Sequence, residues 1–200
     1  MAREIEAKFY IQNPDEFRRH LEAQGARLKE PRVREMNLRF DTPQRDLGRD
    51  GRVLRLRQDT RARITYKDAG QMEAGAINRR ELEFVVSDFD AAREFLEALG
   101  YEVALTYEKY RTTYQLNEVE IMLDEMPYGN FVEIEGAEQA LRPAAERLGL
   151  RWEAAIPGSY SQLFDHVRTQ RRLSFRDLTF DNFRDLHASA ADLGVRPADE

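Results

Sequence analysis

The sequence contains no cysteine and only three histidines among its 200 residues. The absence of cysteine excludes disulfide bonds, thiolate nucleophiles, cysteine-based zinc sites and iron–sulfur clusters. Because His20, His166 and His187 are scattered along the chain, a histidine-rich transition-metal site is not expected either. Any metal ion bound by this chain should therefore be a hard cation held by carboxylate oxygens.

Long hydrophobic runs are also missing, so no transmembrane helix and no membrane partner are predicted. Residues 1–6 are charged and lack the apolar segment of a signal peptide, which predicts a cytoplasmic protein. The formal net charge is −6, from 31 Lys and Arg against 37 Asp and Glu. This charge argues against a nucleic-acid partner, because phosphate neutralisation needs an excess of basic residues on some face. It does not exclude a small basic pocket.

Strict alternation of apolar and polar residues predicts a chain built mainly of strands. In residues 4–11, Ile5, Ala7, Phe9 and Ile11 fall on one face and mostly charged residues on the other, a period of two. The same alternation recurs in residues 34–41, 53–57, 63–67, 79–86, 107–114, 119–124 and 131–135. The chain is therefore expected to fold as an antiparallel sheet with one apolar face.

Helical patterns separate some of these strands and can cover that apolar face. The predicted helices are residues 13–25, 87–99, 137–148 and 159–170. Pro143 is expected to interrupt or restart the third of them. We predict one domain over residues 1–170 and a C-terminal tail over residues 171–200 that is partly packed or disordered.

Charged residues on the polar strand faces come in pairs of like sign. The pairs are Glu4 and Glu6, Glu81 and Glu83, Glu133 and Glu135, Arg55 and Arg57, and Lys109 and Arg111. A spacing of two places both members on one face, about 7 Å apart. Two carboxylates that close repel each other unless a cation lies with them. A solvent-exposed strand face with weak ion pairs would explain any single one of these charges. Few neutral polar residues lie on these faces, however, and this favours a shared cavity for the whole set of charges.

A sheet that curls with these faces inward would place acids and bases in a single cavity. Basic side chains at several heights would hold a chain of phosphates, arginine as a fork and lysine as a point charge. The carboxylates would hold Mg²⁺ or Mn²⁺, which bridges to phosphate oxygens. The pattern therefore predicts a ligand that carries a chain of phosphates.

The N-terminal segment Glu4-Ile5-Glu6-Ala7-Lys8 matches the ExExK signature of a known superfamily. Further matching segments follow in order: Leu54–Arg57, Thr65–Lys67, Arg80–Glu83, Lys109–Arg111, Leu123–Asp124, Phe131–Glu135 and Ser159–Tyr160. Over residues 1–168 the chain resembles the CYTH, or triphosphate tunnel metalloenzyme, superfamily, which includes class IV adenylate cyclases and thiamine triphosphatases. The resemblance implies an α+β, mostly antiparallel fold: a closed eight-stranded β-barrel, the triphosphate tunnel, with a charged lumen and helices packed outside.

The resemblance also implies roles for individual residues, with Mg²⁺ or Mn²⁺ as the cofactor. The implied metal ligands are Glu4, Glu6, Glu83, Asp124, Glu133 and Glu135. The implied substrate-binding residues are Lys8, Arg55, Arg57, Lys67, Lys109, Arg111 and Tyr160. The implied catalytic residues are Lys8, Arg57, Lys67 and Glu81. The alternation pattern adds Arg39 to this set. A position of its side chain in the lumen and one on the outer surface are equally compatible with the sequence.

The family implies more than one activity. Hydrolysis of inorganic triphosphate, thiamine triphosphate or a nucleoside triphosphate is one, and formation of cyclic AMP and pyrophosphate from ATP by a class IV cyclase is another. Residues 35–46 lack the tyrosine-rich segment typical of the cyclases, which favours hydrolysis. Two alternative functions remain: a non-catalytic polyphosphate- or nucleotide-binding module, and an RNA 5′-triphosphatase. The oligomeric state is left open between a monomer and a homodimer.

Overall fold

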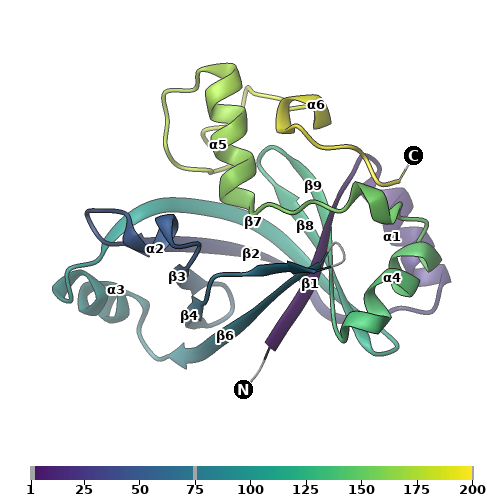
Figure 1. Cartoon of the computed structure of the whole chain (residues 1–200), viewed down its shortest axis with the longest axis horizontal. Helices are drawn as coiled ribbons and strands as arrows, with labels where there is room; N and C mark the ends of the chain where they lie inside the picture. Colours follow the sequence, from purple (N-terminus) through teal and green to yellow (C-terminus); the bar gives the residue numbers. More distant parts are fainter. Residues whose placement is uncertain (1–2, 74–75, 200) are drawn as a thin grey trace.

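The computed structural model describes residues 3–73 and 76–199, and within these ranges a strongly curved sheet is surrounded by helices (Figure 1). The elements are, in order, β1 (Arg3–Ile11), α1 (Pro14–Ala23), β2 (Arg27–Asp41), α2 (Asp46–Arg49), β3 (Val53–Gln58), β4 (Ala62–Lys67), β5 (Gln71–Glu73), β6 (Ala76–Val86), α3 (Phe89–Ala98), β7 (Glu102–Leu116), β8 (Val119–Met126), β9 (Gly129–Glu135), α4 (Glu138–Arg147), the 3₁₀ turn η1 (Trp152–Ala154), α5 (Tyr160–Arg171) and α6 (Ala190–Leu193). No helix in these ranges is both long and apolar enough to cross a membrane.

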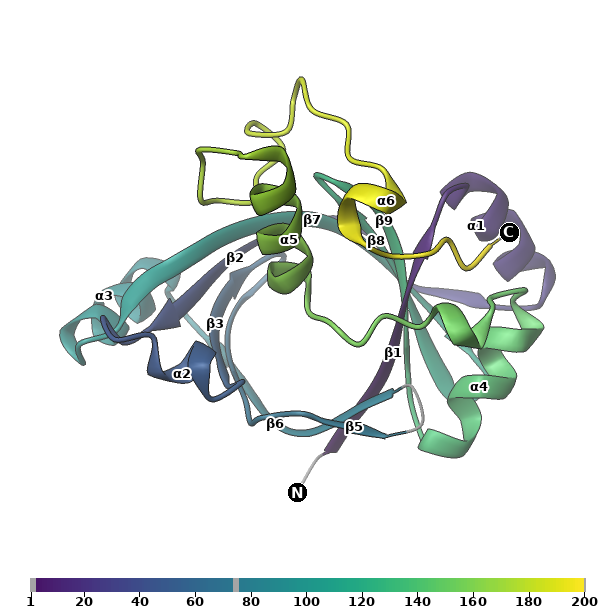
Figure 2. The same ribbon diagram turned by 45° about the horizontal axis from the view of Figure 1, so that its top comes forward.

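The strands form a closed ring. Hydrogen-bonded neighbours follow the order β1, β9, β8, β7, β2, β3, β4 and β6, and the short β5 adds to β6. β1 pairs with β9 through Glu6–Ile11 and with β6 through Arg3–Glu6, so it joins the two ends of the sheet. Figure 2 shows the strands curving around a central opening. The predicted eight-stranded, mostly antiparallel architecture with outer helices is confirmed.

Alternation along each strand decides which side chains face the opening. In β1, Glu6 and Lys8 line the interior cavity, whereas Ala7 and Phe9 pack outward against helices. A single-residue shift in strand pairing would exchange these two sets, so the pattern itself sets the register. The charged lumen and the apolar exterior are thus two consequences of one period-two sequence.

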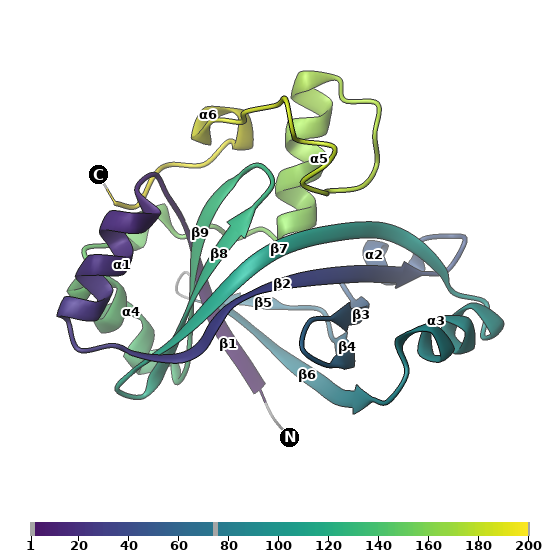
Figure 3. The ribbon, with the colours of Figure 1, turned by 180° about the vertical axis from the view of Figure 1, so that it is seen from behind.

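Three apolar clusters cover the outside of the ring. The first packs α1 and α4 against β1, β8 and β9, and the second packs α2 and α3 against β2, β3 and β4. The third places α5 and the C-terminal segment against β7, β8 and β9. Seen from behind, the long strands β2 and β7 run side by side between the α1–α4 pair and α3 (Figure 3). The helices therefore hold the curvature from outside and leave the lumen to charged groups.

The C-terminal segment packs onto the ring. Leu178, Leu193 and Ala198 are buried, with exposed fractions of 0%, 2% and 0%. The Asp199 carboxylate accepts hydrogen bonds from the backbone N–H groups of Gln12 and Asn13, just before α1, at 2.9 and 3.0 Å. Residues 171–199 thus contribute to the cover over one side of the ring.

Two local expectations differ from the structure. Pro143 does not interrupt the fourth helix, because α4 continues through it with Leu141 and Ala145 both fully buried on either side. The packing of that face offsets the one backbone hydrogen bond that proline cannot donate. The sequence pattern predicts no strand between residues 67 and 79, but residues 71–73 form β5 and pair with β6.

Candidate active site

The ring encloses a cavity of about 670 Å³ to which all eight of its strands contribute. Its basic lining residues are Lys8, Arg39, Arg55, Arg57, Arg63, Lys67, Arg79, Lys109 and Arg111. Its acidic lining residues are Glu6, Glu30, Glu35, Asp59, Glu81, Glu83, Glu120, Glu133 and Glu135. Among the side chains that the structure describes, the two sets are equal in number, so the net charge of −6 says little about the potential that a ligand meets here.

One ion-pair network spans β1, β7, β8 and β9. Lys8 Nζ lies 3.2 Å from Glu133 Oε1, its cross-strand neighbour. Arg111 binds Asp124 through Nε at 2.6 Å and also contacts Glu133. Lys109 Nζ donates to the same Asp124 carboxylate at 2.9 Å. Three predicted phosphate-binding cations are therefore held in place by two carboxylates predicted as metal ligands.

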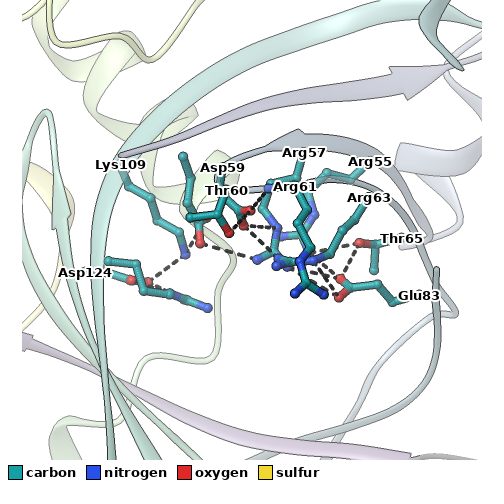
Figure 4. A network of polar contacts seen from close by, with 12 residues as sticks. Arg55, Arg57, Asp59, Thr60, Arg61, Arg63, Thr65, Glu83, Lys109 and Asp124 are labelled. Carbon is teal, nitrogen blue, oxygen red and sulfur yellow. Dashed lines mark hydrogen bonds and ion pairs between the residues drawn. The ribbon is translucent and has the colours of Figure 1, made fainter. Parts of the chain in front are cut away.

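The network continues onto β2, β3, β4 and β6 through Glu35, whose carboxylate lies 3.6 Å from Lys109 Nζ (Figure 4). Arg57 reaches Glu35 through Nη1 and Glu83 through Nη2, at 3.3 Å each. Arg55 Nη2 donates to the Thr65 hydroxyl at 3.1 Å, and that hydroxyl donates to Glu83 at 2.8 Å. These contacts hold the Arg55 and Arg57 guanidinium groups in place, and each such group can bind a phosphate through two N–H donors.

Two further ion pairs lie on β1, β4 and β6. Lys67 Nζ is 3.0 Å from Glu81, and Arg79 Nη2 is 3.1 Å from Glu6. Lys67 and Glu81 are cross-strand partners, so the predicted catalytic lysine and glutamate meet directly.

Tyr160 closes one side of the lumen from the first turn of α5. Its hydroxyl donates to Asp124 at 2.8 Å, and its ring lies 4.2 Å under Lys8 Nζ. The Tyr128 hydroxyl donates to the Tyr160 carbonyl at 2.8 Å, which fixes the start of the helix. This tyrosine therefore couples the cover of the tunnel to the ion-pair network beneath it.

The dense packing of charges shifts several pKa values. Burial alone would raise the pKa of Glu35, but Lys109, Arg111, Arg57 and Arg55 lower it to about 2. Burial opposes ionisation of Glu133 in the same way, and Lys8 and Arg111 hold its pKa well below the ordinary range. For Lys8, the attraction of Glu133 and Glu6 outweighs the effect of burial and raises the pKa. These three groups stay charged at neutral pH.

Carboxylates on three adjacent strands form a row at the metal-binding position implied by the sequence. Glu6 of β1 lies directly opposite Glu135 of β9, which in turn lies opposite Glu120 of β8. Like charges directly opposite one another destabilise a sheet unless they are compensated. The side chain of Glu4 lies outside the part of the chain that the structure describes, although its backbone belongs to β1.

This oxygen-only donor set fits Mg²⁺ or Mn²⁺, which prefer carboxylate ligands, and offers nothing to a soft metal. Among the described side chains, no three acidic or histidine groups converge on one point. Many of the lumen acids contact basic neighbours instead, as Glu6 contacts Arg79 and Glu133 contacts Lys8. Binding of a cation by Glu6, Glu133 and Glu135 would therefore involve an exchange of ion-pair partners.

The structure brings nearly all the residues singled out from the sequence into one lumen. The predicted residues that line it are Glu6, Lys8, Arg55, Arg57, Lys67, Glu81, Glu83, Lys109, Arg111, Glu133, Glu135 and Tyr160. Asp124 lies behind this lining and is 1% exposed. Arg39, for which two positions were open, faces the lumen.

Sequence reasoning missed six charged lumen residues: Glu30, Glu35, Asp59, Arg63, Arg79 and Glu120. Alternation could have found three of them, because Glu35 shares its strand face with Arg39, Arg63 with Lys67, and Arg79 with Glu81. Asp59 follows the end of β3, where a period-two pattern no longer applies, yet it contacts Arg63 at 2.7 Å. Its place in the lumen is a property of the fold.

Comparison with known proteins connects this lumen to a described group. The model of the CYTH domain family matches residues 2–144. No curated protein matches the chain.

Solved structures share the fold. The PH1012 protein of Pyrococcus horikoshii OT3 is 28% identical with a TM-score of 0.68, and the match covers 78% of this chain and 96% of that one. A candidate adenylate cyclase from Vibrio parahaemolyticus is 27% identical with a TM-score of 0.68, covering 81% and 97%. The Hippeastrum protein HpAC1, a candidate adenylyl cyclase described as having a dominant triphosphatase activity, is 19% identical with a TM-score of 0.63, covering 81% and 95%.

Proposed function

The chain belongs to the CYTH family, and on this premise we propose that it is a divalent-metal-dependent hydrolase of a triphosphate. Inorganic triphosphate, thiamine triphosphate and nucleoside triphosphates are the candidate substrates. The observation that carries the proposal is the lumen itself: a closed ring whose interior offers nine basic side chains, matched by carboxylates. A cavity of this kind suits a chain of phosphates, because guanidinium and ammonium groups form charge-assisted hydrogen bonds to phosphate oxygens.

Hydrolysis would transfer the terminal phosphoryl group to water. The bond from the terminal phosphorus to its bridging oxygen breaks, a bond to the water oxygen forms, and the chain leaves one phosphate shorter. When bound, Mg²⁺ or Mn²⁺ would neutralise negative charge on the phosphate oxygens. The protein must hold the chain in line with the water and stabilise the charge that shifts to the leaving oxygen.

The lumen residues divide this work according to their placement. Arg55 and Arg57 of β3 would bind phosphate oxygens as forks, and Lys8 of β1 and Lys109 and Arg111 of β7 would bind them from those strands. Glu81, held by Lys67 at 3.0 Å, would orient the attacking water and accept its proton. Phosphate oxygens would replace carboxylates as partners of the cations, and the freed carboxylates, Glu6, Glu133 and Glu135 among them, would hold the metal.

The decisive experiment is a substrate panel with product identification. Tripolyphosphate, thiamine triphosphate, ATP and GTP are incubated with Mg²⁺ or Mn²⁺, and products are separated by chromatography. Release of orthophosphate from at least one substrate supports the hydrolase. Binding without turnover under either metal would contradict it and indicate a polyphosphate-binding module.

Variant Glu6→Gln tests the metal assignment within the same assay. Removal of one carboxylate oxygen charge should collapse turnover at limiting metal while tripolyphosphate binding is largely kept. Glu94→Gln, on the exposed face of α3, removes one charge away from the lumen and serves as the matched control. Wild-type turnover by Glu6→Gln at limiting metal would show that Glu6 is not a ligand.

A class IV adenylate cyclase is the second candidate, favoured by the likeness to the Vibrio parahaemolyticus candidate cyclase at 27% identity. In that reaction the ribose 3′-hydroxyl attacks the α-phosphorus, and pyrophosphate leaves. Cyclic AMP together with pyrophosphate as products from ATP would support it. Formation of ADP and phosphate without cyclic AMP would reject it.

A further inference from the structure

A second cavity of about 670 Å³ adjoins the lumen at the mouth beneath α5. The two cavities share six lining residues: Arg39, Val53, Ile77, Arg79, Ser159 and Ser161. The remaining walls come from the end of β2, the α2 region, the start of β7 and the first turns of α5. We call this second cavity the vestibule, and its shared walls make it continuous with the lumen.

The vestibule differs from the lumen in its charge. It is lined by six arginines, Arg39, Arg45, Arg52, Arg79, Arg168 and Arg176, but by only two acids, Asp41 and Asp165. The Asp41 carboxylate is already occupied, because it accepts from the backbone N–H groups of Leu47 and Gly48 at 2.9 Å each. Four of the six arginines also pair with a carboxylate: Arg45 with Glu102, Arg52 with Asp50, Arg79 with Glu6 and Arg168 with Asp165. Among the side chains that the structure describes, the vestibule lining still carries more arginines than acids, whereas the lumen lining has nine basic and nine acidic side chains.

Arg39 stands at the junction of the two cavities. Its Nη1 donates to the Ser161 hydroxyl, which lies 3.0 Å from the Ser159 hydroxyl. Among the side chains that the structure describes, no carboxylate comes within ion-pair distance of Arg39, in contrast to Lys8, Arg57 and Arg111. A largely buried guanidinium with a neutral partner retains most of its capacity to bind an anion.

The start of α5 adds to this capacity from the other side. Ser159 caps the helix, accepting from the backbone N–H of Gln162, and the twelve-residue helix directs its positive end toward the junction. Arg39, Ser159 and Ser161 thus present a guanidinium and two hydroxyls to the same space. A phosphoryl group matches this donor set.

The vestibule lining also argues against two groups that a triphosphate substrate could carry at its end: a thiamine moiety and a nucleobase. A thiamine moiety carries a positive charge and would be repelled by six arginines. A nucleobase would need an aromatic face to stack on, and Phe40, the one aromatic side chain in the described lining, is only 2% exposed. A further stretch of phosphate chain meets neither objection.

We propose that Arg39, Ser159 and Ser161 form an additional anion subsite at the tunnel mouth, and that the chain prefers linear phosphate chains of four or more phosphoryl groups. This inference rests on the proposed function, since the lumen must hold the first three phosphates. The basic vestibule then attracts the anionic chain and holds the part that projects from the lumen. The preferred substrate class is thereby an inorganic polyphosphate longer than triphosphate.

The test compares binding of tripolyphosphate and tetrapolyphosphate by calorimetry, without divalent metal so that no turnover occurs. Wild type should bind tetrapolyphosphate about tenfold more tightly, as expected for one added charge-assisted contact. Arg39→Gln should lose about tenfold affinity for tetrapolyphosphate and less than threefold for tripolyphosphate. Arg39→Lys, which keeps the charge but loses the fork, should fall in between.

Controls separate the subsite from folding and from general electrostatics. Arg93→Gln removes one positive charge from the exposed face of α3, where Arg93 pairs with Glu97, and should change neither affinity. Ser161→Ala provides a second, milder variant and should weaken only tetrapolyphosphate, by roughly threefold. Melting temperatures confirm that each variant is folded.

The outcomes distinguish the two proposals. Equal effects of Arg39→Gln on both ligands, or no effect on either, overturn the subsite while leaving triphosphate hydrolysis intact. If wild type binds neither ligand and the substrate panel shows no turnover, the proposed function fails, and the subsite fails with it.

Discussion

Glu35 offers the most direct test of how the lumen charges stabilise the fold. Its side chain is 2% exposed and lies between Arg57 Nη1 at 3.3 Å and Lys109 Nζ at 3.6 Å. The substitution Glu35→Gln keeps the size of the side chain and removes its charge. Because both cations stay buried, the variant loses an attraction without gaining water to replace it.

The magnitude follows from the pKa of Glu35. Its value falls from 4.5 to about 2 on folding, and each pH unit of such a gap corresponds to about 1.36 kcal/mol of stability. The ionised carboxylate therefore contributes about 3 kcal/mol at pH 7. For a depressed carboxyl pKa, this contribution is complete above pH 4.5 and is lost as the pH falls through about 2. At pH 3 about 1 kcal/mol of it should remain.

The assay is equilibrium unfolding in urea at pH 7 and pH 3 for wild type and Glu35→Gln. The variant should be about 3 kcal/mol less stable at pH 7, with a melting temperature lower by roughly 6–12 °C. The difference should shrink to about 1 kcal/mol at pH 3. Glu94→Gln, an exposed control on α3, should stay within about 0.5 kcal/mol of wild type. A Glu35→Gln variant as stable as this control at pH 7 would refute the reasoning.

Further predictions concern the cover, the tail and the metal. Tyr160→Phe removes the 2.8 Å hydrogen bond to buried Asp124 and should cost about 2 kcal/mol in urea unfolding; unchanged stability would show that this bond contributes nothing. Leu178→Ala should cost roughly 2–5 kcal/mol because Leu178 is fully buried, whereas Leu99→Ala at a 60% exposed position should have little effect; equal effects would contradict the packing of the tail. Chelation with EDTA should abolish turnover, and Mg²⁺ or Mn²⁺ should restore it; turnover that survives chelation would exclude a required metal.

Much of the lumen could be predicted because strands alternate. Once Glu6 and Lys8 are assigned to one face of a strand, every second residue shares that face, and no knowledge of distant contacts is needed. The same rule identifies Glu133 and Glu135, and Lys109 and Arg111. It gives no pairing between strands, so it could not show that Lys8 meets Glu133 or that Arg57 meets Glu35.

Closure of the ring also explains which site residues could not be predicted from the sequence. Asp59 enters the lumen from the turn after β3, and Tyr160 covers it from a helix 25 residues beyond β9, where no period relates either residue to the strands. The vestibule likewise depends on the α2 region, β7 and α5, three segments that meet only in the folded chain. Such sites arise from packing between distant elements.

The sequence by itself determined most of the strands and helices and which residues share a strand face, and it predicted a hard-cation site and an anionic class of ligand. These are local properties, set by a period of two and by which residue types are present or absent. Only the tertiary structure decided that the ring closes through β1, that nine cations and nine acids share one lumen, and that Arg39 stands at a basic mouth with a hydroxyl as its partner. The physical reason is that electrostatic energy depends on distances between residues far apart in the chain, and folding alone sets those distances.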